Sequence, residues 1–69
     1  MGRNKATTLL TFLKTLIEKK GNLIPFEDYL TEFKIYVGAD EDRTVKPYLK
    51  LALELGYIEQ QGNNIFIKV

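Results

Sequence analysis

The segment from Asp40 to Ile58 constrains the fold more than any other part of the chain. Its periodicity predicts an amphipathic helix that ends at Gly56 and runs directly into a strand. Apolar positions at three- and four-residue steps share one face of that helix; they are Val45, Tyr48, Leu49, Ala52 and Leu55. The opposite face carries Arg43, Lys46, Lys50 and Glu54. A helix with one buried and one cationic face suits a reader of the DNA major groove, and it is also common among ordinary surface helices.

The composition leaves packing as the source of stability. The chain has 69 residues, which we interpret as one small domain near the lower size limit for a core without disulfides or a metal. It contains no cysteine and no histidine, which removes thiolate and imidazole metal sites, serine triads and histidine acid–base chemistry. There is no phosphate-binding glycine loop either, so we expect neither an enzyme nor a cofactor. Apolar runs are short and no signal sequence follows Met1, so a cytoplasmic protein is expected.

The first third of the chain predicts a helix from Lys5 to Lys20, preceded by a flexible arm over residues 1–4. Its apolar residues follow the i, i+3, i+4, i+7 pattern; they are Leu9, Leu10, Phe12, Leu13, Leu16 and Ile17. Two lysines in the last turn suit the helix dipole, and Gly21 suits the position just after the end.

A second helix is predicted after a short extended segment. Residues 22–24 precede a proline, which favours an extended backbone, so they can pair as a single edge strand. Pro25 suits the first position of the helix that follows. The buried face of that helix is expected to contain Phe26, Tyr29, Leu30 and Phe33. Residues 35–37 either extend the helix or begin the turn at Gly38, and Asp40 is a good N-cap for the third helix.

Pro47 leaves two descriptions of the third helix open. If the helix starts at Asp40, the proline falls in its second turn and removes one backbone hydrogen bond. Either the helix bends there, or the acidic segment is a loop and the regular helix begins near Lys46. We favour a bent or two-part helix. Arg43 shares the face of Lys50 only if the helix is continuous through the proline.

The C-terminal residues predict a β-hairpin. Residues 57–60 and 64–69 are β-prone, and residues 61–63 between them tolerate a tight turn. The alternation in the last strand points one face inward; that face is expected to hold Ile65, Ile67 and Val69. The predicted fold class is therefore α+β, with three helices and a C-terminal hairpin in the order α-β-α-α-β-β.

This order resembles the winged helix-turn-helix family, and the resemblance covers nearly the whole chain as a single domain, residues 1–69. The matching motif is Arg43-Thr44-Val45-Lys46, followed by Tyr48-Leu49-Lys50, then Leu53, then Leu55-Gly56-Tyr57-Ile58. It looks like the pattern in which a Thr-Val pair opens the recognition helix and a Leu-Gly-aromatic-Ile segment leads into the wing. The chain is similar to the compact, cysteine-free versions found among DNA-binding regulators of archaea and their viruses and plasmids.

The resemblance implies a double-stranded DNA-binding protein, a transcriptional regulator with the third helix in the major groove and the hairpin beside the backbone or minor groove. The implied helix contacts are Arg43, Thr44, Lys46 and Lys50. The implied wing contacts are Gln60, Gln61, Asn63 and Asn64. The chain departs from the family pattern at Pro47, where a polar or basic residue is common. It also departs at residues 40–42, where acidic charge would face phosphates.

The charge distribution is uneven although the net charge is only +1. Residues 1–20 carry five cations and one anion, residues 21–42 one cation and six anions, and residues 43–69 four cations and two anions. The acidic residues 40–42 could bind a divalent cation, but the spread ligands of an EF-hand loop are missing. Capping and helix-dipole compensation explain them better, so no metal site is predicted.

The aromatic residues raise the question of self-association. The four tyrosines are interpreted as core-edge residues whose hydroxyls reach water; they are Tyr29, Tyr36, Tyr48 and Tyr57. If Tyr36 and Phe66 are exposed, they mark a patch for a homodimer, because a monomer of this size offers a small DNA footprint. The first helix with the N-terminal arm is a second dimer contact to consider. The alternative function is a winged-helix protein-interaction module, or a small subunit of a replication or transcription complex, which the near-neutral charge favours.

Overall fold

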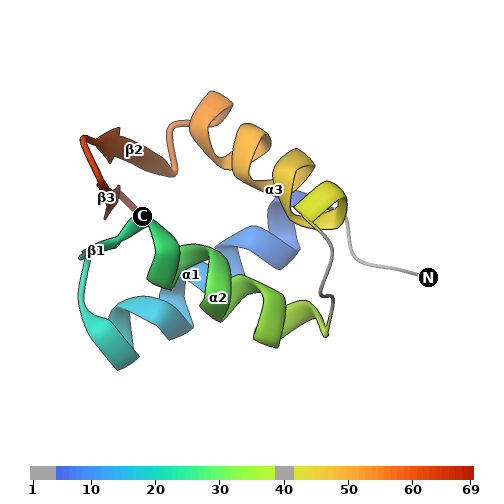
Figure 1. The fold of residues 1–69 in the computed structure, drawn as a ribbon, viewed down its shortest axis with the longest axis horizontal. Coiled ribbons are helices and arrows are strands. Elements are labelled where there is room, and N and C mark those ends of the chain that lie inside the picture. The colour runs from blue at the N-terminus through green and yellow to red at the C-terminus, as the bar shows by residue number, and fades with distance from the viewer. Residues whose placement is uncertain (1–4, 39–41) are drawn as a thin grey trace.

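Three helices and a three-stranded antiparallel sheet make up the protein in the computed structural model, which describes residues 5–38 and 42–69 (Figure 1). In chain order they are α1 (Lys5–Lys20), β1 (Leu23–Pro25), α2 (Phe26–Val37), α3 (Asp42–Glu54), β2 (Ile58–Gln61) and β3 (Asn64–Ile67). The α+β class and the order of elements predicted from the sequence are confirmed, and α1 has the predicted bounds.

The sheet order is β1-β3-β2, so the short strand after α1 joins the hairpin as its outer partner. Gln61 pairs with Asn64, which leaves Gly62 and Asn63 as a two-residue turn. Gly62 has a φ of 61° and Asn63 does not have a positive φ, as a type II′ turn requires. Gln61 was expected in the turn, and it lies in β2 instead. This topology is compatible with a winged-helix arrangement.

The helix α2 differs from its prediction at both ends. Pro25 precedes the helix as its N-cap, with an extended ψ of 144°, and it is also the last residue of β1. Its backbone is therefore not yet helical, which places it one residue earlier than expected. At the other end, residues 35–37 extend the helix, and the N–H of Gly38 closes it by donating to the carbonyl of Lys34.

The helix α3 is one continuous element from Asp42 to Glu54 with Pro47 inside it. The predictions of a two-part helix and of a loop up to Lys46 are therefore wrong. The predicted cap at Asp40 lies outside the described residues. A Schellman motif ends the helix: the N–H of Tyr57 donates to the carbonyl of Ala52, and the N–H of Gly56 to that of Leu53. Gly56 takes a φ of 76° there, which a side chain would disfavour. This tight end turns the chain directly into β2.

An aromatic cluster holds the three helices together. Phe12 of α1 contacts Tyr29, Phe33 and Tyr36 of α2, with ring centroids 5.6, 4.9 and 5.3 Å away. Phe33 in turn lies 5.0 Å from the ring of Tyr48 on α3. The sheet adds apolar residues from its inner face, and the buried core consists of Leu9, Phe12, Leu13, Leu16, Ile24, Tyr29, Phe33, Val45, Ala52, Ile58, Ile65 and Ile67.

Three expectations about burial are wrong. Leu55 is exposed because α3 ends at Glu54 and the chain turns away before the next helical position faces the core. Val69 is exposed because β3 ends at Ile67. The hydroxyl of Tyr29 does not reach water: the residue is buried and this oxygen has no hydrogen-bond partner among the described residues. Tyr36 is exposed as expected, whereas Phe66 is half-buried.

The buried hydroxyl of Tyr29 predicts that Tyr29→Phe stabilises the protein. An unsatisfied buried polar group carries a desolvation penalty, and its removal keeps the ring in place, so we expect the free energy of unfolding to rise by about 1 kcal/mol. Urea unfolding of the variant and the wild type at neutral pH measures this difference in free energy. Tyr57→Phe, at a half-buried tyrosine, is the matched control and should change stability much less. A loss of stability in Tyr29→Phe would mean that the hydroxyl has a partner.

We also predict that the buried Tyr29 lowers the free energy of unfolding at alkaline pH. Burial raises the pKa of Tyr29 above its ordinary value, so the folded state disfavours the phenolate that the unfolded chain forms. The stability linked to this group is therefore complete below about pH 10 and declines above it, by about 1 kcal/mol per pH unit. The difference in unfolding free energy between Tyr29→Phe and the wild type should widen from about pH 9 to about pH 11, on either side of the ordinary tyrosine pKa. A constant difference would contradict the predicted linkage.

Candidate nucleic-acid interface

The outward face of α3 gathers three basic side chains. At 100° per residue, Arg43, Lys46 and Lys50 fall within about 60° of arc around the helix, and all three are exposed. Val45 and Ala52 lie on the other side of the helix and are buried in the core, with 2% and 0% of their surface exposed. Since the helix is continuous through Pro47, Arg43 shares the face of Lys50. The structure therefore brings together the three cations predicted from the sequence.

Lys50 on this face is only loosely held. Lys50 lies 4.0 Å from the carboxylate of Glu54 one turn later, and both side chains are well exposed. An exposed pair of this kind contributes at most a few tenths of a kcal/mol. Lys50 can therefore leave Glu54 for a phosphate at little cost. Glu54 is the acidic side chain beside this face among the described residues of α3.

Lys5 adds a fourth cation near α3 that nothing in the sequence pattern indicated. Its Nζ lies 5.7 Å from the ring centroid of Tyr48, a cation–π distance. Lys5 opens α1, and Tyr48 belongs to the middle of α3, so the contact places a basic side chain from a remote part of the sequence next to the helix. A helical wheel of α3 alone cannot find such a residue.

The structure describes only part of two other predicted features of this helix, the contact residue Thr44 and the acidic residues 40–42. Thr44 lies in the first turn of α3, and its side chain is outside the described part of the structure. Residues 40 and 41 are outside the described residues as well, and for Asp42 only the helical backbone is described. Among the side chains that are described, no cluster of three or more acidic, histidine or cysteine residues is able to hold a metal ion.

The predicted hairpin residues are exposed but divide between the two faces of the sheet. Gln61 and Asn64 are cross-strand partners, so they share one face of the sheet. Gln60 is the cross-strand partner of the buried Ile65, so it lies on the other face. The amide of Gln61 donates to Glu59 at 2.9 Å, and that of Gln60 reaches the carbonyl of Gly62 at 3.4 Å. The predicted wing residues therefore do not form one uniform contact surface.

The tip of the hairpin is fastened to α2 through Asn63. The N–H of Phe26, the first residue of α2, donates to the carbonyl of Asn63 at 2.7 Å. Pro25 offers no side chain to cap this helix, so the hairpin backbone satisfies a donor that would otherwise be orphaned. This bond fixes the tip near one end of the molecule, while the first turn of α3 lies toward the other (Figure 1). The long axis of the molecule measures 34 Å.

Comparisons with protein-family models, with curated proteins and with solved structures match nothing to this chain. The candidate interface therefore rests on the positions and charges of its own residues.

In the described part of the chain, none of the helices has both the length and the apolar character required to cross a membrane.

Because Pro47 lies inside α3, we predict that Pro47→Ala stabilises the protein. The ring cannot donate the backbone hydrogen bond of the helix interior, and its loss outweighs the entropy that the unfolded chain regains. We expect the free energy of unfolding to rise by about 1 kcal/mol, as measured by urea unfolding. Pro25→Ala is the matched control, because that proline precedes its helix and should lose about 0.5 kcal/mol instead. A Pro47→Ala variant that is less stable would contradict the continuous helix.

Proposed function

We propose that this chain is a winged-helix protein that binds double-stranded DNA, with α3 in the major groove, and that it acts as a transcriptional regulator. The observation that carries the proposal is the face of α3 formed by Arg43, Lys46 and Lys50, exposed and opposite the buried side of the same helix. The element order and the sheet order support it, because they are compatible with the winged-helix topology.

The dimensions of α3 fit the major groove. Its 13 residues extend over roughly 20 Å, and the groove of B-DNA is about 12 Å wide, enough for one helix with its side chains. Arg43 lies near the N-terminal end of the helix, the part that meets base edges in helix-turn-helix proteins, and arginine pairs with guanine through two hydrogen bonds. Lys46 and Lys50 are suited to phosphates. The proposal therefore assigns sequence readout to Arg43 and charge neutralisation to the lysines.

We propose a smaller role in DNA binding for the hairpin. Because its tip is fastened to α2, it acts as a fixed edge and not as a mobile arm. Exposed amides on Gln60 and Asn63 are able to hydrogen-bond phosphate oxygens beside the groove. Gln61 and Asn64 point to the other face of the sheet, so we propose that they contribute less.

A protein-interaction module is the second candidate, and one observation favours it. Ile35 and Tyr36 are exposed apolar residues on α2, with 69% and 39% of their surface accessible, and they lie beside a groove between α1 and α2. This feature is separate from α3 and is compatible with DNA binding. The two functions are distinguished by whether the isolated chain binds DNA.

Fluorescence anisotropy with a random-sequence duplex tests the proposal. We expect binding at micromolar protein in low salt, with an affinity that falls steeply as salt rises, because cations on the protein displace counterions from the phosphates. Absence of binding at micromolar protein in low salt would refute the proposal and leave the interaction module as the remaining candidate.

Alanine variants of the three cations test the assignment to α3. Lys46→Ala and Lys50→Ala should weaken binding to all sequences and each lower the salt slope by about 0.9. Arg43→Ala should cost about 1–3 kcal/mol at a preferred site and relax the sequence preference. The matched control is Lys14→Ala, which removes the same charge from the exposed side of α1 and should leave binding nearly unchanged. Equal binding by all four variants would show that α3 is not the interface.

A further inference from the structure

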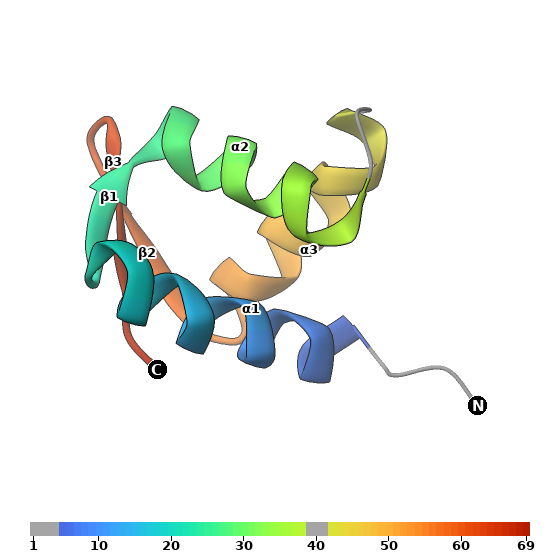
Figure 2. The ribbon, with the colours of Figure 1, turned by 90° about the horizontal axis from the view of Figure 1, so that it is seen from below.

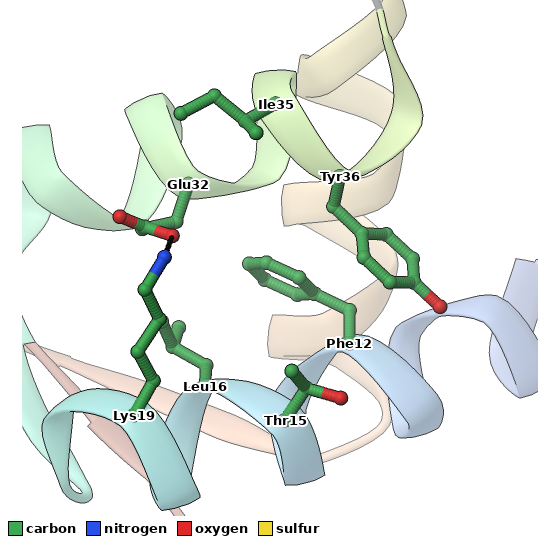
Figure 3. Close-up of a pocket in the computed structure, with 7 residues that line it drawn as sticks. All are labelled: Phe12, Thr15, Leu16, Lys19, Glu32, Ile35 and Tyr36. Carbon is green, nitrogen blue, oxygen red and sulfur yellow. Dashed lines mark hydrogen bonds and ion pairs between the residues drawn. The ribbon is translucent and has the colours of Figure 1, made fainter.

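A groove lies between α1 and α2 (Figure 3), on the side of the molecule away from α3, which runs behind these two helices in Figure 2. It has a volume of about 140 Å³ and its floor is the ring of Phe12. In Figure 3 the helix α3 passes behind α1 and α2, so the groove and the outward face of α3 point in opposite directions.

The walls of the groove are apolar over most of their length. Ile35 is the most exposed of the large apolar residues in the described chain, with 69% of its surface accessible, and Tyr36 continues the same wall. On the α1 wall, the hydroxyl of Thr15 donates to the carbonyl of Thr11 at 3.0 Å. That hydroxyl is already satisfied, so this wall presents little unmet polarity. Exposed isoleucine and tyrosine side by side are typical of surfaces that another protein covers.

One end of the groove is charged, with opposite signs on its two walls. Lys19 on α1 donates to Glu32 on α2 at 2.9 Å, and Lys20 lies 3.9 Å from the same carboxylate. The hydrogen bond from Lys19 holds the pKa of the Glu32 carboxyl below its ordinary value, so the pair is charged at neutral pH. Asp28, one turn before Glu32, adds a second carboxylate on the exposed side of α2. The α1 wall is therefore basic at this end and the α2 wall acidic.

This arrangement is complementary to itself. A two-fold axis along the groove would place α1 of a second copy over α2 of the first and keep corresponding positions level along the axis. Lys19 of each copy would then meet Glu32 and Asp28 of the other. Ile35 of each would meet Thr15 of the other, because Figure 3 shows these pairs on successive levels of the groove. The two-fold axis repeats this contact, so the basic α1 wall of each copy faces the acidic α2 wall of the other.

We propose that a second copy of this chain docks in the groove between α1 and α2, and that the resulting dimer carries its two α3 faces on opposite sides. If α3 binds DNA as proposed above, such a dimer joins two duplexes instead of reading two half-sites of one. The preferred DNA site would then have no two-fold symmetry, in contrast to the palindromes bound by dimers that present both helices to one duplex.

Sedimentation of the protein without DNA tests the dimer. The groove is small, so we expect a dimer that dissociates at concentrations on the order of micromolar. Ile35→Glu should abolish the dimer and keep the fold, because the side chain is already exposed. Leu55→Glu is the matched control, because Leu55 is also a large exposed apolar residue, with 45% of its surface accessible, and does not line the groove; it should leave the dimer intact. A wild-type protein that stays monomeric at about 1 mM, far above the concentration at which such a dimer should form, would overturn the proposal.

Charge exchange tests the contact between copies separately from the ion pair within each copy. Lys19→Glu alone and Glu32→Lys alone should each weaken the dimer, since like charges then meet across the axis. An equimolar mixture of the two variants should form heterodimers, because Glu at position 19 of one copy meets Lys at position 32 of the other. Circular dichroism verifies that each variant is folded. A mixture that associates no better than the single variants would contradict this docking geometry.

Bridging is measured by capture of a fluorescent duplex on a second, immobilised duplex. The wild type should capture it, whereas Ile35→Glu should not, although Ile35→Glu should still bind one duplex in anisotropy. Equal capture by Ile35→Glu and wild type would overturn the inference and leave the proposed function standing. A groove dimer that binds no DNA would refute the proposed function and leave the docking surface standing.

Discussion

Phe12 is the residue around which the helices pack, because it contacts the aromatic side chains of α2. Its ring meets Tyr29, Phe33 and Tyr36, and Phe33 passes the contact on to Tyr48 of α3. The chain has no disulfide, and aromatic pairs of this kind supply both buried area and preferred geometry. This single cluster sets how α3 lies against the other two helices, and so which side of α3 remains outside.

The cluster and the core divide the molecule into two functional sides. The helix α3 buries Val45 and Ala52 and packs Tyr48 against the core, and its three basic residues lie on the outward face. Glu32 of α2 lies in the groove on the opposite side, where it is paired with Lys19. A chain with a net charge of only +1 therefore has a local cationic face. Net charge alone is a poor guide to partners in so small a protein.

Much of the fold could be predicted because local signals and packing agree. The periodicity of α1 and the glycine after it fixed both ends of that helix, and the turn signals placed the hairpin. Two of the failures occur where an element ends before its apolar pattern does. Leu55 and Val69 continue an apolar repeat, but the Schellman motif at Gly56 and the end of β3 turn the chain away from the core.

The candidate site was only partly predictable for a different reason. Arg43, Lys46 and Lys50 lie on one helix, so their common face follows from spacing once the helix is known to continue through Pro47. Lys5 reaches Tyr48 from another helix, and the groove beside Ile35 exists only because α1 and α2 pack together. Contacts between remote segments depend on tertiary packing, which a one-dimensional pattern does not contain.

We propose that α3 is the surface that meets DNA. The most direct measurement is an NMR titration of the isotopically labelled protein with a short duplex, which follows the backbone amide of each residue. The account predicts that the largest shifts lie on α3, around Arg43, Lys46 and Lys50, with smaller ones at the hairpin tip. Shifts concentrated on the groove beside Ile35 and Tyr36, or no shifts at all, would contradict it.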